Sequence, residues 1–358
     1  MTLTVPCLFG LESLVAEEMR RLELKNVRAE NGRVHCDGTM ADIARLNINL
    51  RCGARVLMEL GSFPVRDFEA LFQGVYALPW EDYIPRDGEF PVKGYSLSSQ
   101  LHSVPACQAI VKKASAKRLG EKYGLETLPE SGSRYQIQFA IIKDVATLYL
   151  DTSGEGLYKR GYRARNMGAP LRETLAAALV TLSRYRGQDP FCDPFCGSGT
   201  IPIEAALIAK NRAPGLDRSF AAQKWKNMDS KLWLEAGDEA MDKEFHGHYD
   251  IWAVTLTPPP WIWRGTTRSW PVWMTASALR WRTPENSTGT ASTASWSPTL
   301  PTASVCWKRK RPKSCTGCSA RRSGTCRPSG GCWCSAPIRS LNGALESRRA
   351  KSASSTTA

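Results

Sequence analysis

Hydrophobic positions in residues 1–65 follow first a strand pattern and then a helix pattern, and this order repeats. Strands are expected over residues 3–7 and 54–63, and helices over residues 11–22 and 40–50. A hairpin is expected over residues 27–36, around Asn31-Gly32, which is a favoured pair for a tight turn. The helix of residues 11–22 is predicted from five apolar residues on one face: Leu11, Leu14, Val15, Met19 and Leu22. The order strand–helix–strand–strand–helix–strand predicts a ferredoxin-like unit over residues 1–65.

Residues 66–153 predict a second α+β unit. A helix is expected from residue 68 to 75, a strand over 89–93, a long helix over 104–123, and a hairpin with strands at 135–142 and 145–151. The apolar residues expected to face inward from the long helix are Ala106, Ile110, Val111, Ala114 and Leu119. The basic residues of its other face, together with Lys93, are candidate phosphate contacts, although such a face is also compatible with simple solvation: Lys112, Lys113, Lys117 and Arg118.

Residues 154–252 predict the beginning of an α/β domain. Residues 154–161 read as a hinge-like loop and residues 171–185 as a helix that Pro170 opens. A strand at 190–192, a loop at 193–199 and a helix from Thr200 follow. Residues 210–248 form a helical segment of mixed charge, and residues 249–252 begin another strand.

The loop of residues 193–199 carries candidate ligand chemistry. Gly197 and Gly199 permit a sharp turn and close approach to a ligand, and Thr200 can cap a helix whose N–H groups attract an anion. Asp193 can hold an ammonium group. A ligand with a carboxylate and an ammonium fits, as in the methionine part of S-adenosylmethionine (SAM). The alternative is a plain strand-to-helix connection, since the pattern is neither a dinucleotide fingerprint nor a phosphate loop.

The string Asp193-Pro-Phe-Cys-Gly-Ser-Gly-Thr200, followed by Ile-Pro-Ile-Glu-Ala-Ala, resembles motif I of SAM-dependent methyltransferases that modify amino groups in nucleic acid. The resemblance implies that eight consecutive residues contribute to the cofactor site: Asp193, Pro194, Phe195, Cys196, Gly197, Ser198, Gly199 and Thr200. In the family the preceding helix lies near the cofactor, so Glu173 is a further candidate, with a surface charge on a core helix as the alternative.

Residues 1–165 resemble the N-terminal half of bacterial THUMP-domain RNA methyltransferases. Four stretches carry the resemblance: Pro6-Cys-Leu-Phe-Gly-Leu-Glu12, Leu78-Pro-Trp-Glu-Asp82, Cys107-Gln-Ala-Ile-Val-Lys-Lys113 and Asp151-Thr-Ser-Gly-Glu-Gly-Leu-Tyr-Lys-Arg-Gly-Tyr-Arg163. The implied architecture is α/β: a ferredoxin-like unit (1–65), a THUMP module that grips RNA (66–153) and a Rossmann-like class I methyltransferase domain whose N-terminal half is residues 154–252.

The implied function is methyl transfer from SAM to the N2 amino group of a guanine in 23S ribosomal RNA, on a base flipped out of its stack. A transfer RNA guanine-N2 methyltransferase would share every motif named above. A non-catalytic RNA-binding protein is the third reading, because it requires only residues 1–153.

Residues 253–358 depart from the rest of the chain in composition. They hold 16 Lys and Arg but only Glu285 and Glu346 as acids, which accounts for the entire net charge of +14. They contain no Asp, Phe, Tyr, His or Gln, yet carry eight of the 12 Trp and six of the 12 Cys. No helical or strand period persists, so this segment is expected to be poorly ordered.

The genetic code offers an explanation for this segment. The family places an acidic loop after the strand and an Asn-Pro-Pro-Tyr motif about 45 residues later, and neither is present. When the third base of each codon is read with the first two of the next, residues 253–258 permit Gly-Asp-Ile-Asp-Pro and residues 298–304 permit Asn-Pro-Pro-Tyr-Gly-Glu. Some steps are forced: Trp261-Ile262 yields Asp and Trp307-Lys308 yields Glu. We interpret residues from about 253 as translated out of frame, so the chain is predicted to be inactive and no catalytic residue is named.

Two further expectations concern metals and location. Cysteines near the C-terminus have spacing that suits zinc, but the frame interpretation argues against a metal site: Cys315, Cys318, Cys326, Cys332 and Cys334. No apolar run spans a bilayer and no signal segment opens the chain, so a cytoplasmic protein with free thiols is expected.

Overall fold

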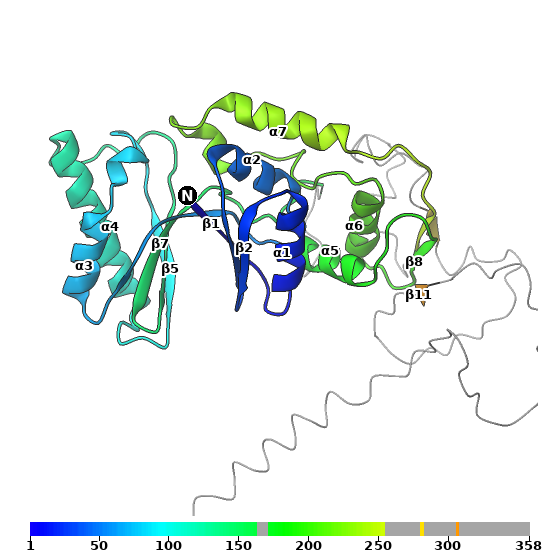
Figure 1. Cartoon of the computed structure of the whole chain (residues 1–358), viewed down its shortest axis with the longest axis horizontal. Helices are drawn as coiled ribbons and strands as arrows, with labels where there is room; N and C mark the ends of the chain where they lie inside the picture. Colours follow the sequence, from blue (N-terminus) through cyan, green and yellow to red (C-terminus); the bar gives the residue numbers. More distant parts are fainter. Residues whose placement is uncertain (163–170, 255–279, 283–305, 308–358) are drawn as a thin grey trace, which may run out of the picture. The chain divides into compact units, whose positions relative to one another are not determined.

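A computed structural model of the chain describes residues 1–162, 171–254, 280–282 and 306–307, all within one compact unit of residues 1–309 (Figure 1). The elements of the N-terminal part are β1 (Thr2–Pro6), α1 (Glu12–Arg21), β2 (Lys25–Glu30), β3 (Arg33–Asp37), α2 (Met40–Asn49), β4 (Leu57–Pro64), α3 (Phe68–Ala77), η1 (Trp80–Asp82), β5 (Val92–Leu97), α4 (Val104–Tyr123), β6 (Ile137–Ile142) and β7 (Val145–Asp151). Those that follow are α5 (Glu173–Leu182), β8 (Phe191–Asp193), α6 (Thr200–Ala209), η2 (Ala221–Lys224), α7 (Ser230–Asp242), β9 (Ile251–Val254), β10 (Arg280–Arg282) and β11 (Cys306–Trp307).

One seven-stranded sheet, in the order β2-β3-β1-β4-β7-β6-β5, runs through both N-terminal units. Strands β4 and β7 pair antiparallel over seven register positions and join the two units edge to edge. The order β2-β3-β1-β4, with two helices, confirms the ferredoxin-like prediction. The strand expected at 89–93 instead begins at Val92, because Pro91 lacks an N–H and Glu89 makes only an isolated bridge with Arg134.

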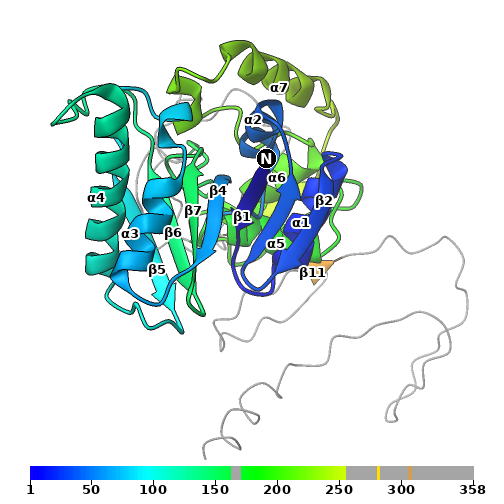
Figure 2. The ribbon, with the colours of Figure 1, turned by 60° about the vertical axis from the view of Figure 1, so that its left-hand side comes forward.

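Helices α1 to α4 cover one face of this sheet. The registered residues Leu3, Met58, Leu150 and Ile137 lie on the same face of β1, β4, β7 and β6, and all belong to one buried cluster. That cluster also contains buried residues of all four helices, such as Val15, Ile43, Leu71 and Val111. In both ribbon views the helices lie outside the strands, with α1 and α2 on one side and α3 and α4 on the other (Figures 1 and 2).

Helix α4 has the predicted bounds, but its buried face is shifted. Val111, Ala114 and Leu119 are buried as expected, whereas Ala106 and Ile110 are only half-buried. Cys107 and Ser115 occupy buried positions instead, and the Ser115 hydroxyl donates to Val111 O (2.9 Å). A small polar residue is tolerated in the core here because its donor is satisfied within its own helix.

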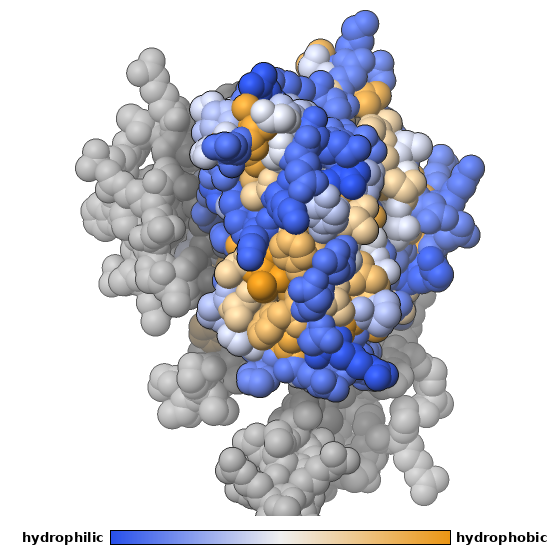
Figure 3. All heavy atoms as spheres, turned by 90° about the vertical axis from the view of Figure 1, so that its left-hand side faces the viewer, coloured by the Kyte–Doolittle hydropathy of each residue, from blue (hydrophilic) through white to orange (hydrophobic). Residues whose placement is uncertain are grey.

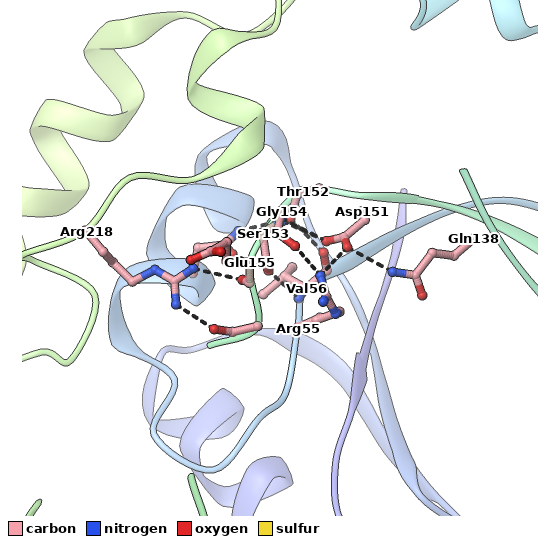
Figure 4. Close-up of polar contacts among 11 residues, drawn as sticks. Arg55, Val56, Gln138, Asp151, Thr152, Ser153, Gly154, Glu155 and Arg218 are labelled. Atoms are coloured by element: carbon pink, nitrogen blue, oxygen red, sulfur yellow. Dashed lines mark hydrogen bonds and ion pairs between the residues drawn. The ribbon is translucent and has the colours of Figure 1, made fainter. Parts of the chain in front are cut away.

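The loop after β7, which the sequence predicts to be hinge-like, is held by several hydrogen bonds in this structure (Figure 4). The buried Asp151 carboxylate accepts from Arg55 Nη1 (2.5 Å) and Gln138 Nε2 (2.9 Å) through Oδ2, and from the backbone N–H of Ser153 (3.0 Å) through Oδ1. Arg218 donates to the carbonyls of residues 155, 156 and 159, each at 2.8 Å. Burial raises the pKa of Asp151, and the neighbouring Arg55 charge opposes that shift.

A second buried polar cluster joins this loop to α6. The Arg160 guanidinium is almost fully buried and donates to Leu157 O (2.7 Å) and Arg51 O (2.5 Å). Its Nε lies 3.5 Å from Glu204 Oε1, which also accepts from the Tyr162 hydroxyl (3.0 Å). The helix α6 is therefore anchored to the N-terminal sheet unit through a buried ion pair.

The remaining described strands form a four-stranded sheet in the order β10-β9-β8-β11. Strands β8, β9 and β10 are parallel and β11 is antiparallel to β8. Helices α5 and α6 pack against each other, and α7 packs against α2. The helix predicted over 171–185 spans only Glu173–Leu182, and Pro170 lies outside the described residues. The strand predicted at 249–252 is confirmed as β9.

Two glycines give opposite predictions for stability. A Cβ on Gly94 of β5 would lie 2.3 Å from Phe139 O, whereas a Cβ on Gly237 of α7 would meet nothing within 4 Å. Gly94→Ala should destabilise the chain by about 1–3 kcal/mol, because the parallel β5–β6 ladder must shift. Gly237→Ala should stabilise it by up to about 1 kcal/mol through helix propensity. Urea unfolding followed by circular dichroism checks both, and equal effects of the two variants would contradict the packing described for β5.

Candidate cofactor site

The strand β8, a six-residue turn and the helix α6 form the candidate site. Phe191 and Asp193 are buried in β8, which pairs in parallel with β9 from Phe191 opposite Ile251 to Asp193 opposite Ala253. Asp193 is therefore the last residue of a parallel strand. At this edge the chain leaves the sheet, which is where ligands bind in open α/β sheets.

Left-handed backbone at two glycines shapes the turn. Gly197 has φ of 51°, and a Cβ added there would meet no atom within 4 Å; Gly199 has φ of 80° and is the N-cap of α6. The Gly199 N–H donates to Cys196 O at 2.7 Å, which closes the turn. Such φ values favour glycine, and the exposed Gly197 leaves its backbone open to close approach.

The predicted capping role of Thr200 is wrong. Gly199 holds the N-cap position, Thr200 is the first helical residue, and no side chain caps α6. The Thr200 hydroxyl instead lies 3.2 Å from the Ser198 hydroxyl. Pro202 has no N–H, and the Ile203 N–H already donates to Gly199 O (3.1 Å), so anion binding at this helix start depends on the amides before Pro202.

Asp193 carries an incompletely satisfied carboxylate. It is only 4 % exposed, and its Oδ1 accepts from the Phe195 N–H at 3.1 Å. Its Oδ2 is buried without a hydrogen-bond partner among the described residues. Burial raises the pKa of Asp193, and the Phe195 N–H opposes the shift. A buried carboxylate that lacks one partner fits a cationic or N–H-bearing ligand group, which would complete its hydrogen bonding.

The other residues of the turn are uncharged, and their contribution to a ligand site is exposed side-chain and backbone surface. Phe195 is 54 % exposed beside the glycines, and Pro194 and Ser198 are half-buried. Cys196 is buried, which raises the pKa of its thiol to about 12, so it is present as a neutral thiol. The site therefore combines one acidic group, an exposed aromatic ring and open backbone at Gly197.

Glu173 lies on α5, the helix that packs against α6, and not in the glycine turn itself. It is the first residue of α5 and is 7 % exposed. A carboxylate in the first turn of a helix interacts favourably with the helix dipole. Its assignment to the cofactor site stays a prediction.

The cations predicted to contact RNA lie mostly in ion pairs. Lys112 Nζ is 2.6 Å from Glu130 Oε1, and Arg118 Nη2 is 2.6 Å from Glu81 Oε1. The Arg118 hydrogen bonds lower the pKa of Glu81 to about 2.

Lys113 and Lys117 lie 5.9 Å from the ring centroid of Phe72 on α3. Figure 3 faces this α3–α4 surface, where hydrophilic residues border a group of apolar ones, and Phe68 is 41 % exposed. The RNA assignments for these residues stay predictions. Lys93 lies elsewhere, on the opposite face of the sheet.

Sequence reasoning missed the buried contacts around α6. Arg160 and Tyr162 lie in a stretch used only for the family resemblance, and Glu204 lies in a helix that reads as apolar. A glutamate inside such a helix is a signal that a buried cation must compensate it. Among the described residues no group of three potential metal ligands occurs, and no helix is long and apolar enough to cross a membrane. The five tail cysteines lie outside those residues.

Two curated relatives and one solved structure resemble this chain. It is 43 % identical over 244 residues to the putative RNA methyltransferase YpsC of Bacillus subtilis, covering 68 % of this chain and 63 % of the relative. It is 33 % identical over 243 residues to the ribosomal RNA large subunit methyltransferase K/L of Magnetococcus marinus, covering 66 % of this chain and 34 % of the relative. The chain thus spans less than two thirds of the length of either relative. The structure of SMU.472, a putative methyltransferase complexed with SAH, has a TM-score of 0.72 and 38 % identity, covering 79 % of this chain and 74 % of that one.

Three protein-family descriptions match consecutive parts of the chain. An RlmL ferredoxin-like domain matches residues 2–57, a THUMP domain residues 65–151, and an RMKL-like methyltransferase domain residues 160–256. These matches agree with the sheet unit and with the Rossmann-like arrangement of β8, α6 and β9. The chain therefore belongs to the methyltransferase family that joins an RlmL-type ferredoxin-like domain and a THUMP domain to an RMKL-like methyltransferase domain.

Proposed function

We propose that this protein acts in the cytoplasm on RNA and is built to transfer a methyl group from SAM to the N2 amino group of a guanine in 23S ribosomal RNA. The observation that carries the proposal is the buried Asp193 carboxylate, whose Oδ2 has no partner among the described residues, beside the open turn at Gly197. Family membership and the SAH bound in the SMU.472 structure support a SAM site. The K/L methyltransferase relatives support ribosomal RNA.

The residues of this chain would bind and orient the methyl donor. Asp193 Oδ2 would accept from the α-ammonium group, and the amides of the turn before Pro202 would donate to the carboxylate. Phe195 would offer an exposed ring beside the ligand. SAM supplies an activated methyl group on a sulfonium. Catalysis then depends mainly on holding the target nitrogen in line with that methyl, which is a matter of position.

We also propose that the chain in its present frame is inactive, because residues from about 253 are read out of frame. The match to the methyltransferase domain ends at residue 256, close to the point where the composition changes. The Asn-Pro-Pro-Tyr motif that the second frame permits at 298–304 lies outside the described residues. The binding half of the site would remain while the target-base loop is lost.

One prediction of the proposed function concerns the affinity for SAM and its dependence on pH. Asp193→Asn should weaken SAM binding by about 10- to 100-fold, since a hydrogen bond to a charged group contributes about 1.5–3 kcal/mol. Wild-type affinity should fall as the pH is lowered through the raised pKa of Asp193, because the protonated carboxyl no longer attracts the ammonium. The variant should lack this dependence. Calorimetric titration with SAM measures both.

Asp250→Asn is the matched control, because Asp250 is an exposed acid one residue before β9.

The pH dependence of the free energy of unfolding provides a second test of the ionisation of Asp193. The folded-state pKa of Asp193 is above its unfolded value, so its ionisation costs stability as the pH rises through the folded pKa. Asp193→Asn should therefore gain stability relative to wild type as the pH rises through the raised pKa of Asp193. If the Asp193→Asn chain binds SAM as tightly as wild type, Asp193 does not bind the ammonium group of SAM.

Another prediction of the proposed function concerns the reading frame. A chain rebuilt with the second frame from codon 253 should transfer tritiated methyl from SAM to ribosomal RNA, whereas the chain in its present frame should not. Transfer to purified 23S ribosomal RNA and to transfer RNA should be compared, followed by digestion and identification of the methylated nucleoside. Transfer only to transfer RNA would favour the alternative substrate. No transfer by the rebuilt chain to either RNA would contradict the enzyme proposal.

A further inference from the structure

The uncovered face of the seven-stranded sheet presents side chains of both N-terminal units. The register places Arg33 and His35 of β3 on the face opposite to α1–α4, since their neighbours Val34 and Cys36 belong to the core. By the same pairing, Glu59, Tyr149, Gln138 and Lys93 lie across β4, β7, β6 and β5 on that face.

This face is strongly concave. Arg33 Nη1 donates to the Tyr149 hydroxyl (3.2 Å) and Nη2 to the Tyr95 hydroxyl (3.0 Å). In the strand order β3 and β5 are five steps apart, about 24 Å in a flat sheet. Two side chains that stand upright on a flat sheet would not meet at that separation, so the sheet curls and its uncovered halves approach each other. In Figures 1 and 2 the strands lie between α1 and α2 on one side and α3 and α4 on the other.

A cavity of about 310 Å³ lies in this concave face, near the lower limit of the roughly 300–1,000 Å³ typical of small-molecule sites. Its lining includes residues of both units: Arg28, Glu30, Arg33, His35, Glu59 and Tyr149. Among the described residues, neither Arg28 nor Arg33 lies in an ion pair with a carboxylate. This distinguishes them from Lys112 and Arg118 of α4, whose charges are already compensated.

The chemistry of the cavity is divided. Arg33 is held by two tyrosine hydroxyls, which fix the guanidinium while leaving further N–H donors, a geometry suited to phosphate. Glu59 and Glu30 lie near His35, at 4.0 and 3.4 Å from its ring nitrogens. Two carboxylates disfavour a bare phosphate but accept hydrogen bonds from the exocyclic amino group of a base. A ligand with both a phosphate and an amino-bearing base fits both halves.

We propose that this concave face is a binding site for one unpaired nucleotide of the RNA substrate, with Arg28 and Arg33 on the phosphate and Glu59 on the base amino group. The inference rests on the proposed RNA substrate but concerns a site separate from the Asp193 turn. Lys93, predicted from the sequence to contact RNA, lies on the same face two residues from Tyr95. It would extend the phosphate contacts along the strand.

Fluorescence anisotropy of the full chain with labelled 12-nucleotide oligocytidine and oligouridine tests the site. Wild type should prefer oligocytidine, because uridine lacks an exocyclic amino group. Arg28→Met and Arg33→Met should each weaken binding at least tenfold. Each should also reduce the slope of log K against log salt by about 0.7, the value for one lost phosphate contact on a single strand. Glu59→Gln should remove the preference for oligocytidine with less effect on the salt slope.

Lys231→Met on α7 is the matched control, because Lys231 is an exposed cation without an ion pair among the described residues. Arg28 is exposed, so its replacement keeps the fold even if Arg33→Met does not, and circular dichroism checks each variant. Wild-type binding by Arg28→Met and folded Arg33→Met would overturn the site. Methyl transfer by the rebuilt chain that is unaffected by Arg28→Met would also count against this site alone. If the rebuilt chain transfers no methyl group but still binds the oligonucleotide in an Arg28-dependent way, only the proposed function is contradicted.

Discussion

The contacts of the buried Arg160 guanidinium connect α6 to the loop after β7 and to the backbone that follows α2. An uncompensated charge in a protein interior is very costly, so every conformation that keeps Arg160 buried must also keep its acceptors. These acceptors are the carbonyls of Leu157 and Arg51 and the Glu204 carboxylate. Because Glu204 lies one turn after Thr200 on α6, Arg160 connects the first turns of α6 to the backbone at the end of α2.

The Asp151 carboxylate imposes a similar constraint at the end of the sheet. It accepts from Arg55 before β4, from Gln138 on β6 and from the loop that leaves β7. Two neighbouring polar clusters thus hold the loop that contains glycines 154, 156 and 161. Gly161 is favoured here because its φ of 94° lies in the left-handed region, and because a Cβ would lie 3.0 Å from Asp217 O.

The two candidate ligand sites differ in the sign of the charge that lacks a partner. At the turn after β8, a carboxylate is buried with one oxygen lacking a partner among the described residues, so the site is ready for a cation. On the concave face of the sheet, guanidinium groups are left without carboxylate partners in the described part of the chain, so the site is ready for an anion. The basic face of α4 looks equally suitable in sequence, but Glu81 and Glu130 from other segments compensate three of its cations.

The sequence alone determined the local structure and the chemistry of the turn. Period-two and period-3.6 patterns located six of the seven strands of the N-terminal sheet and its four main helices, because burial of one face repeats along each element, whereas β5 was placed three residues too early. The Asp193–Thr200 string and Asn31-Gly32 were readable for the same reason, since short-range geometry selects glycine and capping-type residues at fixed offsets. Only the cap assignment failed there, because Gly199 took the position expected for Thr200.

Tertiary structure decided everything that depends on residues far apart in the chain. The pairing of β4 with β7 made two predicted units into one curved sheet, and that curvature brought Arg33 to Tyr95 across 62 positions. The ion pairs that occupy α4, and the Arg160–Glu204 contact, likewise join segments separated by 18 to 44 positions. No local pattern encodes such contacts, because the free energy of a charge depends on which groups surround it in space and not on its neighbours in sequence.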